Sequence, residues 1–340
     1  MPQEAQGREG GIEMVVFLLR RFVGYLVLVG IATCLGYLLA AASLNPRANF
    51  EGRNPPPPPE SVDRALTDLN LNDKTPVLER FGTWISGVLH GDFGKTIGGE
   101  PVSDEMGRRM GVSLRLLFIA SVLGALLGVL IGVIGAVRQY RFSDHATTFL
   151  SFLTLSTPVF LLAVLLKLGA LQINRAAGTT ILYYTGEATP GLQGSWWQIA
   201  ADRVQHFVLP TLAIVVGLAA FYSRYQRNAM LDVLGSDFLR TAQAKGLRRR
   251  QALLKHGLRT ALIPMATFFA YQFGLLLTGA TFIEKIFGWH GMGEWFVDSV
   301  NRNDVNVVAA VTVFAAVLVL LAGMLADLTH AALDPRVRIR

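Results

Sequence analysis

The sequence has few charged residues and a single cysteine. Asp, Glu, Lys and Arg make up only 16% of its 340 residues, whereas soluble globular domains carry about 25%. The lone Cys34 excludes an intrachain disulfide and a cysteine-rich metal site. With 52% hydrophobic residues and a mean hydropathy of +0.42, the composition indicates an integral membrane protein.

Charge is missing from several long stretches of the chain. Five stretches are long enough to cross a bilayer, which takes about 20 apolar residues, and contain no Asp, Glu, Lys or Arg. A sixth stretch is shorter and includes Pro210. We therefore predict an all-α membrane protein with six transmembrane helices. The predicted spans are residues 22–42, 116–137, 146–166, 204–222, 265–283 and 305–325.

The distribution of positive charge predicts the orientation of these spans. Residues 224–264 carry nine basic and two acidic side chains, a balance of +7 that equals the net charge of the whole chain. Because Lys and Arg are retained on the cytoplasmic side, we expect residues 223–264 to form a cytoplasmic loop and residues 43–113 a long external loop. Both termini would then be cytoplasmic.

The polar amino terminus has alternative explanations. Residues 1–13 read as a disordered extension that precedes the six-span domain of residues 14–340, and Met14 is a plausible alternative start. Arg20 and Arg21 precede an apolar stretch, as in a secretory or twin-arginine signal. That stretch is 21 residues long and five more spans follow it, so a span is favoured over a cleaved signal.

No Asp, Glu, Lys or Arg lies in the middle of a predicted span. Proton- and sodium-driven carriers place such groups at bilayer depth, so their absence argues against that energy source. The four charged residues at span ends are Lys167, Glu284, Lys285 and Asp327.

Enzyme chemistry has little support in the sequence. The six histidines are scattered, without metal-ligand spacing or an evident nucleophile and base. Gly94, Lys95 and Thr96 resemble the end of a phosphate-binding loop, but Leu89 stands where the first glycine is required. We predict no catalytic, cofactor-binding or metal site in this chain and no nucleic-acid partner.

Two helical patterns predict packing surfaces. Gly124, Gly128 and Gly132 recur every four residues and form a groove for a neighbouring helix, which is either within the chain or in another subunit. In the external loop, Thr75 and Pro76 suit the start of a helix. Its apolar positions, ending before Gly91, are Val77, Phe81, Trp84, Ile85 and Val88.

The 223–264 loop is predicted to contain two short helices that meet at a glycine. From Asp237 to Lys245, an acidic residue opens the helix, and Phe238, Ala242 and Gly246 share one face. A second helix over residues 250–260 would place Leu254, Leu258 and Ala261 together. Such a knob could enter a cleft in another protein. Alternatively, its basic residues could bind anionic lipid; these are Arg248, Arg249, Arg250, Lys255 and Arg259.

This loop resembles the coupling motif of ABC importer permeases, in the dipeptide and oligopeptide (peptide/nickel) branch. The resemblance rests on residues 240–247 and 254–259. Arg240 and Thr241 replace the acidic residue and first alanine of the general motif, and Arg259 replaces its final proline. Residues 71–76, 90–94, 282–293 and 334–336 resemble other segments of that branch, so the likeness covers Met14 to Arg340. The long external loop suggests the first, or B-type, permease.

The resemblance implies a type I ABC importer permease in a bacterial cytoplasmic membrane. Its expected partners are a second homologous permease, two ATPase subunits or one fused ATPase, an extracytoplasmic binding protein, membrane lipid and a peptide substrate. ATP and magnesium would be bound by the ATPases, not by this chain. The residues expected to couple to them are Asp237, Phe238, Arg240, Thr241, Ala242, Ala244, Lys245, Gly246, Leu247, His256, Leu258 and Arg259.

Three other functions remain open. One is an ATPase-independent channel or secondary carrier, and another is a lipid-anchored scaffold that relies on the basic loop. A third is an importer of the same family for nickel, glutathione or another small solute.

Overall fold

The computed structural model describes the backbone of residues 2–51 and 54–333, and throughout these ranges the regular elements are helices. The helices are α1 (Pro2–Ser43), α2 (Ala48–Glu51), α3 (Pro59–Asp68), α4 (Val77–Val88), α5 (Val102–Val137), α6 (Phe142–Ser156), α7 (Val159–Ala177), α8 (Trp196–Leu234), α9 (Asp237–Ala244), α10 (Arg249–Ala252), the π-helical turn η1 (Leu253–Gly257), α11 (Leu258–Phe287), α12 (Met292–Asn301) and α13 (Val305–Leu333). The predicted all-α fold class is confirmed.

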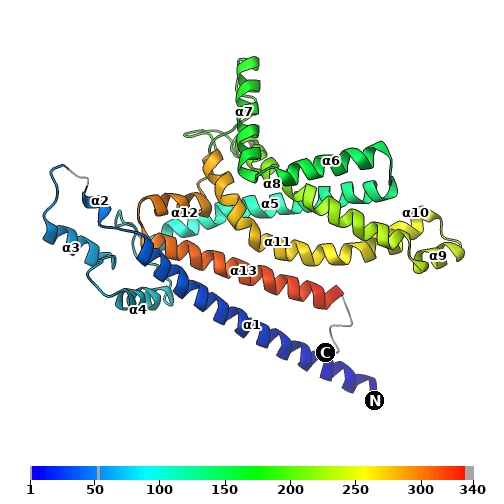
Figure 1. Ribbon diagram of the computed structural model, residues 1–340, viewed down its shortest axis with the longest axis horizontal. Helices are drawn as coiled ribbons and strands as arrows, with labels where there is room; N and C mark the ends of the chain where they lie inside the picture. Colours follow the sequence, from blue (N-terminus) through cyan, green and yellow to red (C-terminus); the bar gives the residue numbers. More distant parts are fainter. Residues whose placement is uncertain (1, 52–53, 334–340) are drawn as a thin grey trace.

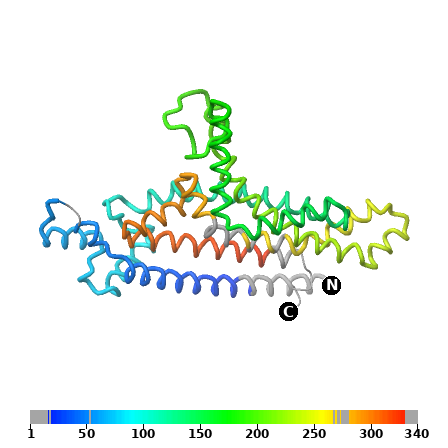
Figure 2. Tube along the Cα trace, turned by 45° about the horizontal axis from the view of Figure 1, so that its top comes forward, coloured from blue at the N-terminus to red at the C-terminus, as the bar shows by residue number. Residues whose placement is uncertain are grey.

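The long helices lie side by side in an elongated bundle (Figures 1 and 2). Helices α3, α4 and α12 lie toward one end, and α9 and α10 form the opposite end. The start of α1 and the end of α13 point toward the α9–α10 end (Figure 1). This arrangement agrees with an even number of spans, because both ends of the bundle domain then lie on one side of the membrane.

Most of the predicted spans fall inside helices of sufficient length. Five segments of the described chain are long and apolar enough to cross a membrane: Leu19–Glu51, Val102–Val137, Val159–Ala177, Trp196–Leu234 and Val305–Leu328. The predicted span 265–283 lies within α11, where many side chains fall outside the described residues. A six-span bundle is therefore consistent with the structure.

The third predicted span differs from the structure. A continuous helix over 146–166 was expected, but α6 ends at Ser156 and α7 begins at Val159. The break lies at Pro158, the N-cap residue of α7. Proline lacks an N–H donor and disfavours a helical conformation in the residue before it. Accordingly Thr157 is extended, with φ −92° and ψ 124°. After this break α7 projects sideways from the bundle (Figures 1 and 2). Pro210, in contrast, is accommodated inside α8.

Two predicted boundaries also differ. α1 begins at Pro2, so the backbone of residues 2–13 is helical where a disordered extension was expected. Extending an existing helix avoids the cost of nucleation, and Pro2 is tolerated in a first turn. In the 43–113 loop, α4 starts at Val77 with the extended Pro76 as its N-cap, and the predicted Thr75 cap is absent.

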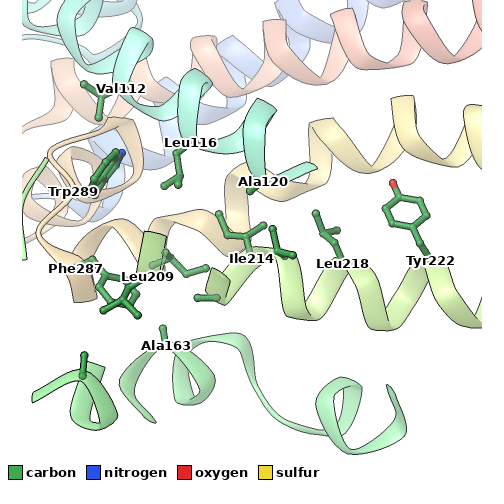
Figure 3. Packing of buried hydrophobic residues seen from close by; sticks show 14 of the residues in the cluster. Val112, Leu116, Ala120, Ala163, Leu209, Ile214, Leu218, Tyr222, Phe287 and Trp289 are labelled. Carbon is green, nitrogen blue, oxygen red and sulfur yellow. The ribbon is translucent and has the colours of Figure 1, made fainter. Parts of the chain in front are cut away.

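The central core forms where α5 packs on α8 (Figure 3). Val112, Leu116 and Ala120 of α5 face Ile214 and Leu218 of α8, all at most 6% exposed. Apolar side chains gain little free energy by moving from lipid into a protein core, so helix contacts in a membrane depend on close van der Waals packing. The same cluster includes Ala163 of α7, Phe287 and Trp289, so it also fixes the root of the projecting helix.

The three predicted packing glycines lie on the α5 surface that faces α8. A Cβ at Gly124 would lie 2.6 Å from the Leu218 Cβ, and one at Gly128 would lie 2.5 Å from the Tyr222 Cβ. At Gly132 it would lie 2.5 Å from the Ser223 carbonyl oxygen. Glycine is needed here because the backbones approach too closely for any side chain.

We predict that Gly132→Ala destabilises the bundle by about 1–3 kcal/mol, the usual cost of overpacking, because the Ser223 backbone cannot move aside. Gly111→Ala is the matched control on α5, since a Cβ there meets nothing within 4 Å. Thermal unfolding of both purified variants is the measurement. An unchanged midpoint for Gly132→Ala, relative to Gly111→Ala, would contradict the close contact.

Candidate functional site

The turn after α8 is a compact unit built from local signals. Ser236 precedes α9 as its N-cap residue, and Asp237 places a negative charge in the first turn. Gly246 has a φ of +94°, which glycine adopts without strain. The Leu247 N–H then donates to the Ala242 carbonyl at 3.3 Å and closes the end of the helix. We call residues 236–247 the knob.

A buried leucine fixes the knob to three long helices. Leu239 of α9 is 2% exposed and belongs to a hydrophobic cluster at the end of the bundle. The other buried members are Ala136 of α5, Met230 and Val233 of α8, Ala252, Leu253, and Ala261 of α11. Because one cluster joins all these elements, a force on the knob acts directly on α5, α8 and α11.

The predicted coupling residues divide into an outer and an inner face. Phe238 is 44% exposed, so it points away from the cluster that Leu239 enters. Ala242 and Leu247 are half-buried against that cluster. The other predicted coupling residues of the knob are exposed: Asp237, Arg240, Thr241, Ala244, Lys245 and Gly246. Sequence reasoning missed Leu239, although Leu239, Ala242 and Gly246 at i, i+3 and i+7 also have helical spacing.

The second predicted helix has a shifted register. Leu253 is 9% exposed and Leu254 is 52% exposed, so the predicted inner position Leu254 is wrong. The cause is η1, whose wider π-helical turn separates the inner positions Leu253 and Leu258 by five residues in place of four. Gly257 allows η1 to lie close to α8, because a Cβ at this position would lie 3.1 Å from the Val233 Cγ1. Of the remaining predicted residues, Leu258 is half-buried, and His256 and Arg259 are exposed.

A partly buried ion pair ties α6 to α8 near the knob. The Arg227 guanidinium donates from Nε to Asp144 Oδ1 at 2.6 Å and from Nη2 to Oδ2 at 2.8 Å. This two-pronged contact holds the pKa of the Asp144 carboxyl below its usual value. Further along the same two helices, the Ser151 and Ser223 hydroxyls lie 3.2 Å apart. These contacts extend the rigid end of the bundle to α6.

A second buried carboxylate organises the opposite end. Glu284 of α11 is fully buried, accepts a hydrogen bond from the Ser113 hydroxyl at 2.5 Å, and accepts from the Gly293 N–H at 2.7 Å. Ser113 in turn accepts from the Met292 N–H at 2.8 Å. This network, which sequence reasoning did not identify, joins α5, α11 and the start of α12. Its carboxylate is stabilised by N–H groups at a helix start.

Nothing in the described part of the chain suggests chemistry at this site. No group of three or more His, Cys, Asp or Glu side chains there is placed to hold a metal ion. The knob instead presents an exposed aromatic ring, Phe238, and a basic surface around a rigid glycine turn. Such a surface suits contact with another macromolecule.

Comparison with known proteins identifies the family. The model of the binding-protein-dependent transport system inner membrane component family matches residues 128–339. The oligopeptide transport system permease protein OppB of Mycobacterium tuberculosis (strain ATCC 25618 / H37Rv) is 55% identical over 326 residues, which cover 96% of this chain and 100% of that protein. The permease AppB of an oligopeptide transport system in Bacillus subtilis (strain 168) is 32% identical over 327 residues, 95% of this chain and 99% of AppB.

More distant relatives extend the comparison. The glutathione transport system permease protein GsiC of Salmonella paratyphi A (strain ATCC 9150 / SARB42) is 33% identical over 278 residues, 81% of this chain and 84% of GsiC. A chain in the structure of the inward-facing MetNI methionine ABC transporter has a similar fold, with a TM-score of 0.51 at 20% identity. The match covers 67% of this chain and 96% of that one. This chain is thus a multi-pass membrane protein that belongs to the family of binding-protein-dependent transport system inner membrane components.

Proposed function

We propose that this chain is a permease subunit of an ATP-driven importer that takes up oligopeptides. The observation that carries the proposal is the knob, which is exposed on its outer face and seated by Leu239 on the ends of α5, α8 and α11. Family membership and the 55% identity to an oligopeptide permease support the same function. Transport, and not catalysis, would be the role of this chain.

The energy source would lie in partner subunits. The sequence contains no complete phosphate-binding loop, so ATP and magnesium would bind to two ATPase subunits or to one fused ATPase. Closure of the ATPases would push the knob. A second, homologous permease would complete the translocation path, and an extracytoplasmic binding protein would deliver the peptide.

Shape should matter more than charge in this coupling. Moving a gate from 1:99 to 99:1 requires about 5.5 kcal/mol of differential interaction. An exposed ion pair contributes only about 0–1 kcal/mol. A firm contact of the partner with the exposed Phe238 and Gly246 is therefore needed, and the cluster beneath the knob, against which Ala242 packs, provides a rigid base for it.

The proposed orientation places the knob in the cytoplasm. The +7 balance of residues 224–264 supports this orientation. Because α1 begins and α13 ends toward the knob (Figure 1), the ends of both helices would also be cytoplasmic. The membrane would be the bacterial plasma membrane. Glutathione or nickel remains an alternative substrate, and a relative at 33% identity is named for glutathione transport.

We predict that Gly246→Trp abolishes ATP-dependent peptide uptake and retention of the ATPase subunits, while membrane insertion is preserved. A bulky residue at a φ of +94° would distort the exposed turn that ends α9. Gly191→Trp is the control, because Gly191 is also exposed, with a φ of +72° and open space around it. Copurification of the ATPase with each variant checks the prediction, and normal ATPase retention by Gly246→Trp would refute the coupling role.

We predict that replacing Arg248, Arg249 and Arg250 together with Gln lowers uptake by less than about threefold. All three side chains are exposed, and such charges contribute little to a seated contact. Initial rates of labelled-peptide uptake in whole cells are the readout. Complete loss of function, with the protein still in the membrane, would favour the lipid-anchored scaffold instead.

We predict that the purified chain alone, in liposomes, moves no labelled peptide, because the ATPases must drive the gate. The complete complex with its binding protein should accumulate peptide only when ATP is supplied. Solute flux through the isolated chain at a rate comparable to that of the complex would instead establish the channel or carrier alternative.

A further inference from the structure

Arg224 lies where α6 packs against α8, at the surface of the bundle. Its guanidinium lies over the Phe152 ring, with the central carbon 3.9 Å from the ring centroid. Arg224 is half-buried and Phe152 is 48% exposed, so this contact can be reached from outside the protein. A guanidinium that rests on a ring through its face keeps the N–H groups along its edge free to donate hydrogen bonds.

The charge of Arg224 has no partner in the described part of the chain. There, no carboxylate lies within 4.0 Å of its guanidinium, and no acceptor takes a hydrogen bond from it. Arg227, one turn further along α8, donates to both carboxylate oxygens of Asp144. The two arginines line one shallow notch between α5, α6 and α8. Arg224 therefore places an uncompensated cation beside an ion pair that is already complete.

A hydroxyl beside Arg224 is also unused. Thr148 of α6 lines the same notch and lies one helical turn before Phe152. The neighbouring Thr147 hydroxyl donates to the Ser143 carbonyl at 2.9 Å, whereas within the described chain the Thr148 hydroxyl has no hydrogen-bond partner. Two donors thus lie at one accessible position without an acceptor.

The position along both helices corresponds to the edge of the membrane. Arg224 lies two residues beyond the predicted span 204–222, and Phe152 lies six residues, or about 9 Å, inside the predicted start of the third span at residue 146. Side chains on a helix lean toward its N-terminus, so the Arg224 guanidinium reaches back toward the span, where it meets Phe152. This depth corresponds to the boundary between lipid headgroups and hydrocarbon on the knob side.

We propose that Arg224 and Thr148 bind the phosphate group of a phospholipid in the membrane leaflet on the knob side. The edge of the guanidinium matches two phosphate oxygens, and the Thr148 hydroxyl supplies a further donor. An unpaired cation at this depth is costly, and a lipid phosphate supplies the missing counter-charge. The site is separate from the outer face of the knob and adds lipid binding to the proposed transport function.

The neighbouring side chains favour lipid as the source of the phosphate. Phe149 is 66% exposed and Leu153 is 55% exposed. Phe149 lies three residues before Phe152 and four before Leu153, so helical spacing puts all three on one side of α6. Acyl chains can therefore cover this apolar surface while the phosphate meets the guanidinium above Phe152. A free anion would gain nothing from these side chains.

The test is native mass spectrometry of the complete, delipidated transporter titrated with phosphatidylglycerol. Arg224→Met keeps a long apolar side chain against Phe152 and breaks no ion pair, so it should fold. We expect the tightest phosphatidylglycerol to bind about tenfold more weakly, as for the loss of one charge-assisted hydrogen bond. Arg64→Met is the control, because the Arg64 side chain is 82% exposed on α3, and should bind lipid as the unmodified protein does.

Two further arms test the ring and the phosphate separately. Phe152→Leu, which removes the ring but keeps an apolar side chain, should weaken phosphatidylglycerol binding about two- to fivefold, as for the loss of one cation–π contact. Diacylglycerol, with acyl chains but no phosphate, should not bind tightly. Equal phosphatidylglycerol affinity in the unmodified protein and Arg224→Met, or equal affinity of the unmodified protein for diacylglycerol, would overturn the proposal.

The same preparation distinguishes two other ligands of Arg224. Inorganic phosphate that displaces the lipid at millimolar concentration would show that a free anion is the ligand. Loss of a homologous permease from the complex in Arg224→Met, with unchanged lipid binding, would show that Arg224 contacts a protein partner. Either result would overturn the assignment to a lipid phosphate.

Discussion

The contact between α5 and α8 is the constraint on which the rest of the structure depends. Hypothetical Cβ atoms at Gly128 and Gly132 would fall within 2.5 Å of α8 atoms, so the two backbones have no room to slide or rotate against each other. Interiors packed this tightly change between discrete arrangements and do not deform continuously. α5 and α8 therefore move as one body, and the elements attached to them move with it.

This rigid pair joins the two ends of the bundle. At one end, Ala136 of α5 and Met230 of α8 share a hydrophobic cluster with the knob. At the other end, Ser113 of α5 bonds to Glu284 of α11, whose carboxylate also holds the start of α12. A displacement of the knob thus reaches the far end through packed helices. No flexible linker intervenes on that path within the described chain.

The sequence was most informative where one physical requirement dominates. A bilayer requires long uncharged helices, so the apolar runs located most of the bundle. The glycine spacing identified the α5 surface that α8 covers, although it could not name the partner helix. The family likeness pointed to the knob. Each of these signals arises from residues near one another in the sequence, or from a simple period along it.

Other features depend on tertiary context and were not predicted. Whether a proline breaks a helix depends on its neighbours: Pro158 ends one, whereas Pro210 remains inside α8. The register of the predicted helix over residues 250–260 depends on η1, and a π-helical turn has no simple sequence signal. Ser113, which bonds Glu284, is 171 positions from it, and Arg227, which pairs with Asp144, is 83 positions from it. Such pairs become visible only when the chain is folded.

The location of these irregular elements limits how the bundle can switch between two states. If α5 and α8 move together, relative motion must occur where the helical ladders are interrupted. The described chain has such interruptions at Thr157–Pro158, where α7 leaves the bundle, and at η1, where the knob meets α11. Both adjoin the rigid pair, and neither lies inside it. A displacement of the knob would therefore be converted into rotation of α7 and α11, relative to α5 and α8, about these points. Because the middle of each predicted span carries no Asp, Glu, Lys or Arg, this rotation does not require an ion pair to be broken within the membrane.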